Sequence, residues 1–373
     1  MKITITAVKA DVGGCGGHIR PDPRMKEAIA KFLETAKGVS IIDFHIQSVG
    51  DDIGIIMTHT QGENSEVVHK LAWDAFCKAT EIAKSLGLYG AGQDLLKDSF
   101  SGTIKGMGPA IAEMEIEERP AETIVCFQAD KTEPGAYNLP LYLMFADPMH
   151  NSGLMLSPKM SEGFNFEIID VEKTDADTII SLNAPEDIYD IVTLIRNNHR
   201  YIIEKVFSRT TGEIAAVNCT TRLSLIAGKY VGKDDPIMLV RAQSQFPATG
   251  EILSPFTIVH YVSGFMRGSH IGPLTPVPIN SDISYFDGPP IVSAVAFNVK
   301  NGKLTNMVDC FANQFWNGIR EKANLKALYI REQGFSGPAM LEDKELEYGG
   351  ITERLDKLKD RFYTRKKVVK QKP

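Results

Sequence analysis

The sequence predicts an α/β protein with an extensive β-sheet, and three observations support this prediction. The chain has 373 residues, of which 43% are hydrophobic, so it can bury a substantial core in one large domain or two ordinary ones. Residues 2–10 alternate apolar and polar side chains, which is typical of a strand with one buried face. The clearest helical pattern, at residues 65–86, follows two strand patterns, and the second half of the chain repeats this mixture.

The first half of the chain carries a simple succession of patterns after the strand at 2–10. Asn64 and Ser65 are N-cap candidates for the long helix, and a glycine-rich passage at 87–109 follows it. The further elements that we expect are a helix at 24–37, strands at 40–47 and 52–59, a helix at 65–86, and strands at 110–118 and 122–131.

The second half repeats the alternation of strands and helices. We expect strands near 164–171 and 178–182, a helix at 186–207, strands at 213–218, 221–227, 237–243, 256–262 and 291–298, and a final helix around 308–323. The basic segment at the C-terminus predicts a solvated surface extension. No Pro/Ser-rich linker, internal repeat or low-complexity tract divides the chain. We therefore expect a single α/β unit, with a division into two domains near 150–160 as the open alternative.

Composition excludes several classes of function. The net charge is −6 and no basic stripe precedes the C-terminus, which argues against general nucleic-acid binding. The five cysteines are scattered and form no C-x-x-C pair, so neither a disulfide framework nor a zinc knuckle is predicted, and a reducing cytoplasm is the expected compartment. The N-terminus lacks the apolar core of a signal peptide, and no apolar run is long enough to span a membrane.

Acidic and amide side chains gather where predicted strands end or turn. This set consists of Asp11, Asp51, Asp52, Gln93, Asp94 and Asp130. Such a set suits magnesium, a hard ion that takes about six oxygen ligands and shares them with substrate phosphates. Two or more ions would polarise phosphoryl oxygens and activate an attacking water. The alternative is that each acid belongs to an ordinary turn.

The loop that follows Asp11 has four glycines in five positions, which let the backbone approach a ligand closely. His18 lies on the same loop. Imidazole suits softer metals than magnesium, so His18 is either a metal ligand or a hydrogen-bonding group for a substrate hydroxyl or phosphate.

The segment "AGKYVGKDDP" combines Tyr230, Lys233 and the pair Asp234–Asp235 between glycines. A lysine nucleophile must be neutral, whereas neighbouring carboxylates hold it protonated. Divalent cations bound by those carboxylates would reverse the local charge, and Tyr230 could then donate or accept a proton. The alternative is an exposed hairpin turn with an ordinary lysine.

Two nucleotide-binding motifs are excluded by spacing. "GKYVGKDD" lacks the P-loop pattern, because an aspartate follows Lys233 where the magnesium-binding hydroxyl should stand. "GLYGAGQDLL" contains only fragments of the dinucleotide fingerprint and follows a helix instead of a strand.

These motifs together resemble the bifunctional fructose-1,6-bisphosphate aldolase/phosphatase family, gluconeogenic enzymes of archaea and some deep-branching bacteria. The resemblance covers essentially the whole chain. It rests on the segments "ITAVKADVGGCGGHIRP", "VGDDIGIIM", "LYGAGQDLLKDSFSGTIKGMGP", "FQADKTEPGAYN", "AGKYVGKDDPIMLVRAQSQ", "YFDGPP" and "LEYGG". It implies a four-layer α-β-β-α sandwich in one domain, here residues 1–355 followed by a basic tail at 356–373, and assembly into cytoplasmic homo-octamers.

The resemblance also implies a role for each matching residue. Lys233 matches the lysine that forms a Schiff base with dihydroxyacetone phosphate, Tyr230 the proton donor and acceptor of the aldol step, and Asp11 the base that activates water. The implied Mg²⁺ ligands are Asp11, His18, Asp51, Asp52, Gln93, Asp130, Asp234 and Asp235. The implied substrate contacts are His18, Tyr89, Gly102, Thr103, Lys131, Gln243, Ser244, Arg267, Asp287 and Tyr348.

The implied activity is condensation of two triose phosphates to fructose 1,6-bisphosphate, followed by Mg²⁺-dependent removal of the 1-phosphate to leave fructose 6-phosphate. Small phosphorylated sugars are therefore the expected partners, with no nucleic acid and no membrane. Two alternatives stay open: a Mg²⁺-dependent sugar phosphatase in which Lys233 only contacts phosphate, and a sugar-phosphate sensor that does not turn its ligand over.

Overall fold

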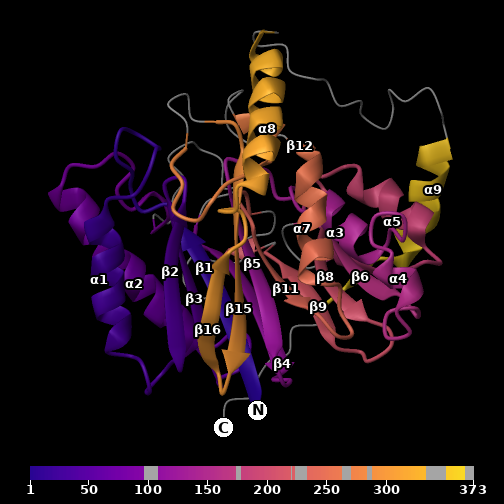
Figure 1. The fold of residues 1–373 in the computed structure, drawn as a ribbon, viewed down its shortest axis with the longest axis horizontal. Coiled ribbons are helices and arrows are strands. Elements are labelled where there is room, and N and C mark those ends of the chain that lie inside the picture. The colour runs from indigo at the N-terminus through magenta and orange to yellow at the C-terminus, as the bar shows by residue number, and fades with distance from the viewer. Residues whose placement is uncertain are drawn as a thin grey trace.

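The structure, a computed structural model, describes residues 1–95, 108–173, 178–219, 221–222, 233–262, 270–283, 288–332 and 350–365. These residues form two β-sheets that pack face to face, with helices on both outer faces (Figure 1). The predicted α-β-β-α sandwich is confirmed. Among the described residues, no helix is both long and apolar enough to cross a membrane.

The smaller sheet has five strands in the order β10-β4-β1-β3-β2, each antiparallel to its neighbours. Its strands are β1 (Lys2–Ala10), β2 (Asp43–Val49), β3 (Asp52–His59), β4 (Ala110–Glu117) and β10 (Thr221–Arg222). Two helices cover its outer face: α1 (Pro23–Glu34) and α2 (Glu66–Ser85). Asp22 caps α1 by accepting a hydrogen bond from the Arg24 N–H, and Ser65 caps α2 in the same way from Val68.

The larger sheet has ten strands, and nine of them follow the order β14-β15-β5-β11-β9-β8-β6-β7-β17, while β16 pairs with β15. The strands are β5 (Glu122–Asp130), β6 (Phe164–Asp170), β7 (Thr178–Ala184), β8 (Tyr201–Ser208), β9 (Ile214–Asn218), β11 (Ile237–Ala242), β14 (Thr275–Pro276), β15 (Ile291–Lys300), β16 (Lys303–Asp309) and β17 (Tyr363–Thr364). A separate two-stranded sheet joins β12 (Tyr261–Val262) and β13 (Gly272–Pro273).

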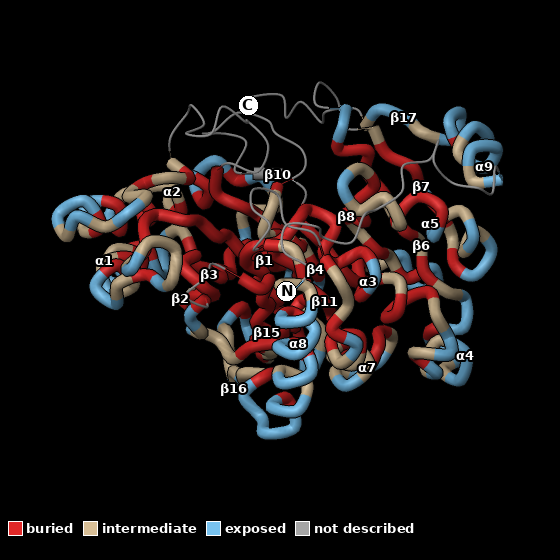
Figure 2. The backbone as a smooth tube through the Cα atoms, turned by 90° about the horizontal axis from the view of Figure 1, so that it is seen from above, coloured by how far each residue is buried: buried red, intermediate tan, exposed pale blue. Residues whose placement is uncertain are grey.

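Further helices pack on the outer face of the larger sheet. They are α3 (Asn138–Phe145), α4 (Gly153–Leu156), α5 (Ile188–Ile195), α7 (Thr249–Leu253), α8 (Phe315–Glu332) and α9 (Gly350–Leu358), with the 3₁₀ turns η2 (Ser254–Ile258) and η5 (Lys359–Arg361) beside them and η1 (Gln93–Leu95) near the smaller sheet. Figure 2 shows the strands as a buried centre, with exposed surface on the outward sides of α1, α8 and α9.

The hydrophobic core has one layer on each side of each sheet. Val8 of β1 packs toward α1 and α2, whereas Ile5 of the same strand packs between the sheets against residues of β5 and β15. On the far side, Phe127 of β5 stacks on Phe256 with ring centroids 4.8 Å apart. The prediction that β1 has one buried face is wrong, because α1 and α2 cover the face that carries Thr4 and Thr6 and was expected to meet water, while the second sheet covers the apolar face.

The predicted helix at 186–207 is confirmed only in its first half. The segment forms α5 and then turns at 197–200 into β8. The apolar residues Ile202, Ile203 and Val206 suit either a helix or a strand, so spacing alone could not separate the two. Strand β8 lies between β6 and β9, and both of its faces are buried, which is why the sheet accepts this run of apolar residues.

Three more boundaries differ from expectation. Within the predicted strand at 256–262, residues 256–258 belong to the 3₁₀ turn η2, whose second residue is Pro255, and only β12 is extended. The final helix begins at Phe315, because residues 303–309 form β16 against β15. Of the predicted strand at 221–227, residues 223–227 lie outside the described part. Helix α9 crosses the predicted domain boundary at residue 355, and β17 pairs with β7.

Candidate active site

The acidic residues meet at one end of both sheets. Asp11 follows β1, Asp51 and Asp52 occupy the turn from β2 into β3, and Asp130 ends β5. Strands β1 and β3 are antiparallel neighbours, so the end of one lies beside the start of the other. Strand β5 belongs to the larger sheet, and its carboxyl end reaches the same place. The packing of the two sheets therefore assembles the cluster.

The ligand atoms in this cluster are close enough to share cations. Those of Asp11, His18 and Asp51 lie within 4.8 Å of one another, and so do those of Asp51, Asp52 and Asp130. Nδ1 of His18 is 2.7 Å from Oδ2 of Asp51 and 3.5 Å from Oδ2 of Asp11. Asp51 belongs to both groups, so the two candidate metal sites are adjacent.

Two lysines partly balance these carboxylates. Lys9 of β1 is almost fully buried and its amine contacts Asp52. The amine of Lys131 lies 2.6 Å from Oδ1 of Asp51 and 3.1 Å from Oδ1 of Asp130. Each amine supplies one positive charge to a place where four carboxylates converge, so the cluster retains capacity for further cations.

Asp130, like Asp51, is fully buried. Both of its carboxylate oxygens are buried, and neither accepts a hydrogen bond from the described residues. Gly50, with a positive φ of 54°, leaves the space that this carboxylate occupies, because a Cβ at Gly50 would lie 1.7 Å from Oδ2 of Asp130. The Lys131 amine at 3.1 Å is the charged neighbour of Asp130, and a buried carboxylate that accepts no hydrogen bond stays costly unless a further cation approaches it. The oxygen-rich donor set fits a hard divalent ion.

Burial and mutual repulsion shift the ionisation of the cluster. Burial and the neighbouring Asp51 raise the pKa of Asp11 to about 7, and burial with Asp235 nearby raises the pKa of Asp52 to about 6, although Lys9 opposes that shift. Hydrogen bonds to Asp11 and Asp51 raise the pKa of His18 to about 10. In the metal-free protein His18 is therefore a cationic donor at neutral pH, whereas a metal ligand must be neutral.

The segment with Lys233 joins the same end of the molecule. Lys233 is 4% exposed, and its amine lies 2.6 Å from Oδ1 of Asp234. Asp235 binds the loop after β5: its Oδ1 accepts the Thr132 N–H at 2.6 Å, and its own N–H donates to the Thr132 carbonyl at 3.1 Å. The alternative of an exposed turn with an ordinary lysine is wrong.

Two residues here hold an unusual backbone conformation. Lys131 has a φ of 64° and Asp235 a φ of 49°, which is uncommon for residues with side chains. Such conformations cost of order 1–3 kcal/mol each and concentrate at functional sites. Lys131 precedes Thr132 in the loop after β5. Asp235, just before β11, exchanges hydrogen bonds with the same threonine.

Electrostatics keep the Lys233 amine charged in this arrangement. Burial lowers its pKa, but Asp234, Asp94 and Asp235 outweigh burial, and the net pKa lies well above the ordinary value for lysine. Burial in turn raises the pKa of Asp234 to about 7, against the opposing effect of the lysine. A nucleophilic role for this amine therefore requires the aspartates to move away or to be neutralised.

The rim of the cluster contains further predicted residues. Tyr89 is 61% exposed and its ring meets the His18 ring edge to face, with centroids 5.0 Å apart. The amide oxygen of Gln93 and the ring of His18 both lie beside Gly90. The structure thus brings five of the eight predicted metal ligands into two adjacent groups, with Gln93, Tyr89 and Lys131 beside them, whereas Asp234 contacts Lys233 and Asp235 the loop after β5.

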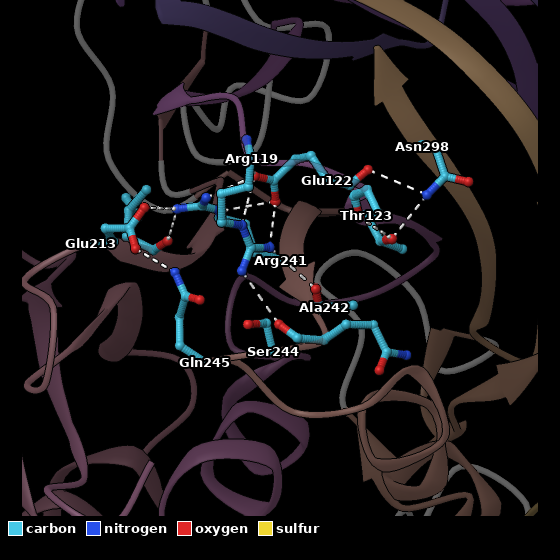
Figure 3. Close-up of polar contacts among 12 residues, drawn as sticks. Arg119, Glu122, Thr123, Glu213, Arg241, Ala242, Ser244, Gln245 and Asn298 are labelled. Carbon is cyan, nitrogen blue, oxygen red and sulfur yellow. Dashed lines mark hydrogen bonds and ion pairs between the residues drawn. The ribbon is translucent and has the colours of Figure 1, made fainter. Parts of the chain in front are cut away.

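Other predicted residues lie elsewhere. Gln243 and Ser244 follow β11, next to the first residues of β5, so they lie about 20 Å from Asp130 along the strands (Figure 3 shows Ser244 there). The remaining predicted residues lie outside the described part of the chain: Tyr230, Gly102, Thr103, Arg267, Asp287 and Tyr348.

Sequence reasoning missed two contributors to the site, Lys9 and Gly50, and the backbone contacts of a third, Asp94. Lys9 faces the neighbouring sheet, and the charge of a lysine within an otherwise apolar strand could have indicated an inward partner. Gly50 precedes the acidic pair, but only the position of Asp130 reveals why it lacks a side chain. Asp94 is buried and accepts backbone hydrogen bonds from Asp11 and Gly108, contacts that no sequence pattern predicts.

Comparison with known proteins gives a consistent result. A family model described as fructose-1,6-bisphosphatase matches residues 2–363. A fructose-1,6-bisphosphate aldolase/phosphatase of Ignicoccus hospitalis is 53% identical over 363 residues, 97% of this chain and 93% of the relative. Proteins of the same name are 50% identical in Thermus thermophilus, over 97% of this chain and 100% of the relative, and in Sulfurisphaera tokodaii, over 100% and 97%.

Proposed function

Since this chain belongs to the fructose-1,6-bisphosphatase family, and its relatives are named as bifunctional aldolase/phosphatases, we propose that it performs both reactions. It condenses dihydroxyacetone phosphate with glyceraldehyde 3-phosphate to fructose 1,6-bisphosphate and then hydrolyses the 1-phosphate. The observation that carries the proposal is the buried Lys233, which shares one end of the molecule with an acidic cluster suited to divalent cations.

The hydrolytic step uses the acidic cluster, and Mg²⁺ is the proposed ion. Asp11, Asp51, Asp52 and Asp130 would hold it, with Gln93, Asp234 and Asp235 beside them and His18 as ligand or donor. Bound Mg²⁺ supplies charge neutralisation to the phosphoryl oxygens and acidifies water. Asp11, with a pKa of about 7, is suited to accept a proton from the attacking water near neutral pH. Lys131 is suited to bind a substrate phosphate.

The condensation step uses Lys233. Its neutral amine attacks the carbonyl carbon of dihydroxyacetone phosphate, a C–N bond forms, and water leaves to give the Schiff base. Tyr230 donates and accepts the protons of the carbon–carbon bond formation. Because Asp234 holds the lysine protonated in this structure, the step requires the segment to rearrange. We propose that Lys233 and Tyr230 face the substrate during condensation, and that Asp234 and Asp235 turn onto the cations for hydrolysis.

Assembly completes the proposal. Gln243 and Ser244 lie too far from the acidic cluster to contact the same substrate within one chain. In the proposed homo-octamer they contact substrate across a subunit interface. The remaining proposed contacts are Tyr89, Gly102, Thr103, Arg267, Asp287 and Tyr348. The five cysteines form no disulfide, which suits a proposed cytoplasmic location.

One incubation tests both activities. Supplied with the two triose phosphates and Mg²⁺, the protein should release free phosphate and form fructose 6-phosphate in equal amounts. Borohydride added with dihydroxyacetone phosphate should attach the triose to Lys233. Label on another residue, or none, contradicts the proposed nucleophile.

The sugar phosphatase without aldolase action is the second candidate, and the ion pair between Lys233 and Asp234 favours it because that amine is protonated. Lys233→Arg retains the charge but cannot form the imine. We expect this variant to lose condensation and borohydride labelling while it still hydrolyses fructose 1,6-bisphosphate. Survival of condensation in this variant would exclude an imine at Lys233, and phosphate release without any condensation by the wild type would establish the phosphatase alternative.

A further inference from the structure

Asp94 occupies the place where the pairing of β1 with β4 stops. The last pair of this ladder joins Lys9 to Ala110, and the same register continued by two residues would set Asp11 opposite Gly108. In a regular antiparallel ladder, such residues would bond to each other. Instead both N–H groups donate to the carboxylate of Asp94: that of Asp11 to Oδ2 at 2.9 Å and that of Gly108 to Oδ1 at 3.0 Å.

The contact is reciprocal on the β1 side. The N–H of Asp94 donates to the carbonyl of Asp11 at 3.0 Å, and the N–H of Gly92 donates to that of Val12 at 3.0 Å. Asp94 therefore acts as the strand partner that Asp11 would otherwise lack. Both backbone polar groups of Asp11 are held by one residue, which is itself 6% exposed.

This clamp controls where the Asp11 side chain points. With its backbone fixed, Asp11 accepts the Gly13 N–H on Oδ1 at 3.0 Å and directs Oδ2 toward His18, 3.5 Å away. An ionised carboxylate is required at position 94 because both of its oxygens accept a backbone hydrogen bond. An asparagine there would turn an amide donor toward one of the two N–H groups.

We propose that Asp94 is a positioning residue for the hydrolytic reaction, which holds the Asp11 carboxylate in the orientation that the cation and the attacking water require. This inference rests on the proposed function. It assigns Asp94 no contact with substrate or cation, because its carboxylate is already bonded to the two backbone N–H groups. Outer groups of this kind typically change metal affinity 10–100-fold when they are altered.

The variant Asp94→Asn tests the inference against the control Asp74→Asn. Asp74 lies on α2, is 38% exposed and pairs only with Lys70 among the described residues. In calorimetric titration with MgCl₂, we expect Asp94→Asn to bind Mg²⁺ at least tenfold more weakly than wild type. Its kcat for phosphate release at saturating Mg²⁺ should fall at least tenfold, with KM for fructose 1,6-bisphosphate changed less than threefold. The control should match wild type in all three.

The outcomes separate the inference from the proposed function. If wild type releases no phosphate, the proposed function fails, yet the Mg²⁺ titration still tests Asp94. If Asp94→Asn is folded and binds Mg²⁺ within twofold of wild type, the positioning role is overturned. Should the variant not fold, amide hydrogen exchange on wild type decides: we expect protection at Asp11 and Gly108, and exchange at the rate of a free amide at both would overturn the clamp.

Discussion

At the scale of single residues, the candidate site depends on the close contact between the Gly50 backbone and the Asp130 side chain, which leaves no space for a Cβ at Gly50. Gly50 combines a φ of 54° with direct contact to the Asp130 carboxylate. Any larger residue at this position must both strain the turn and displace the buried carboxylate of Asp130. The turn before Asp51 thus determines the position of an acid that lies eighty residues later in the chain.

Gly50→Ala should therefore lower phosphatase activity at least tenfold and weaken Mg²⁺ binding, because the new Cβ pushes Asp130 out of place. The matched control is Gly87→Ala: its φ is 66°, and a Cβ there would meet no atom within 4 Å. Both variants should lose about 1 kcal/mol of stability from backbone strain. Equal activity in the two variants would show that the contact with Asp130 has no functional effect.

Ionisation of the cluster makes cation binding depend on pH. Burial raises the pKa of Asp11 and of Asp234 to about 7, whereas in the unfolded chain such groups ionise near pH ~4. These raised values mean that unfolding releases protons, so the metal-free protein loses stability as pH rises from about 4 to about 7. Cations must displace the same protons.

We accordingly expect Mg²⁺ to raise the melting temperature by a few degrees more at pH 8 than at pH 6. Thermal unfolding in MgCl₂, compared with NaCl of equal ionic strength, measures the difference. An equal Mg²⁺-dependent shift at both pH values would contradict the raised pKa of these carboxyls.

At the scale of elements, N-cap side chains stabilise the two helices on the smaller sheet. Asp22 accepts hydrogen bonds from the backbone N–H of Arg24 at 3.0 Å and from its guanidinium at 2.8 Å. These contacts lower the pKa of Asp22 to about 2. Its contribution to stability is thus complete above about pH 4 and is lost as pH falls toward 2.

Asp22→Ala should lower the free energy of unfolding by about 1 kcal/mol at pH 7, since the cap is lost, while Asp22→Asn keeps most of it. Urea unfolding of both variants measures the loss. Phosphatase activity should stay within twofold of wild type, because α1 lies outside the acidic cluster. A similar loss for Asn and Ala would show that the charge of Asp22, and not the cap, stabilises the helix.

At the scale of the whole molecule, a buried ionic network stabilises the end opposite the candidate site (Figure 3). Glu122 accepts paired hydrogen bonds from both Arg119 and Arg241, at 2.6–3.1 Å, and Arg241 also reaches Glu213 at 3.1 Å. Both guanidinium groups lie over the ring of Phe246. The network connects the start of β5 with β11 and the turn before β9, which are neighbours in the larger sheet.

Glu122→Gln should destabilise the protein by about 3 kcal/mol, because the fully buried Arg241 loses the buried one of its two counter-charges and keeps only the partly exposed Glu213. Chemical unfolding measures this loss, with Glu186→Gln as the control for an exposed pair with Arg209. Activity per folded molecule should be unchanged, since the length of β5 separates Glu122 from Asp130. Lost activity in the folded variant would mean that the two ends of the sheet are coupled.

Local patterns determined much of the fold and part of the site. The sequence could indicate the N-cap at Ser65, the strands β3 and β5, and the turn that contains Asp51 and Asp52. Each of these features depends on neighbours in the chain. The acids were predicted because a set of oxygen ligands at strand ends suits magnesium, and the family resemblance implied the same residues.

Only the tertiary structure decided the rest, because it depends on which surfaces meet. The run at 201–208 became a strand because neighbouring strands cover both its faces. Lys9 contacts Asp52, and Gly50 contacts Asp130. Both contacts join elements whose arrangement in space the sequence does not reveal. Gln243 and Ser244 lie near Lys233 in the chain but at the other end of a strand, and an extended backbone of six residues is long enough to remove them from the site.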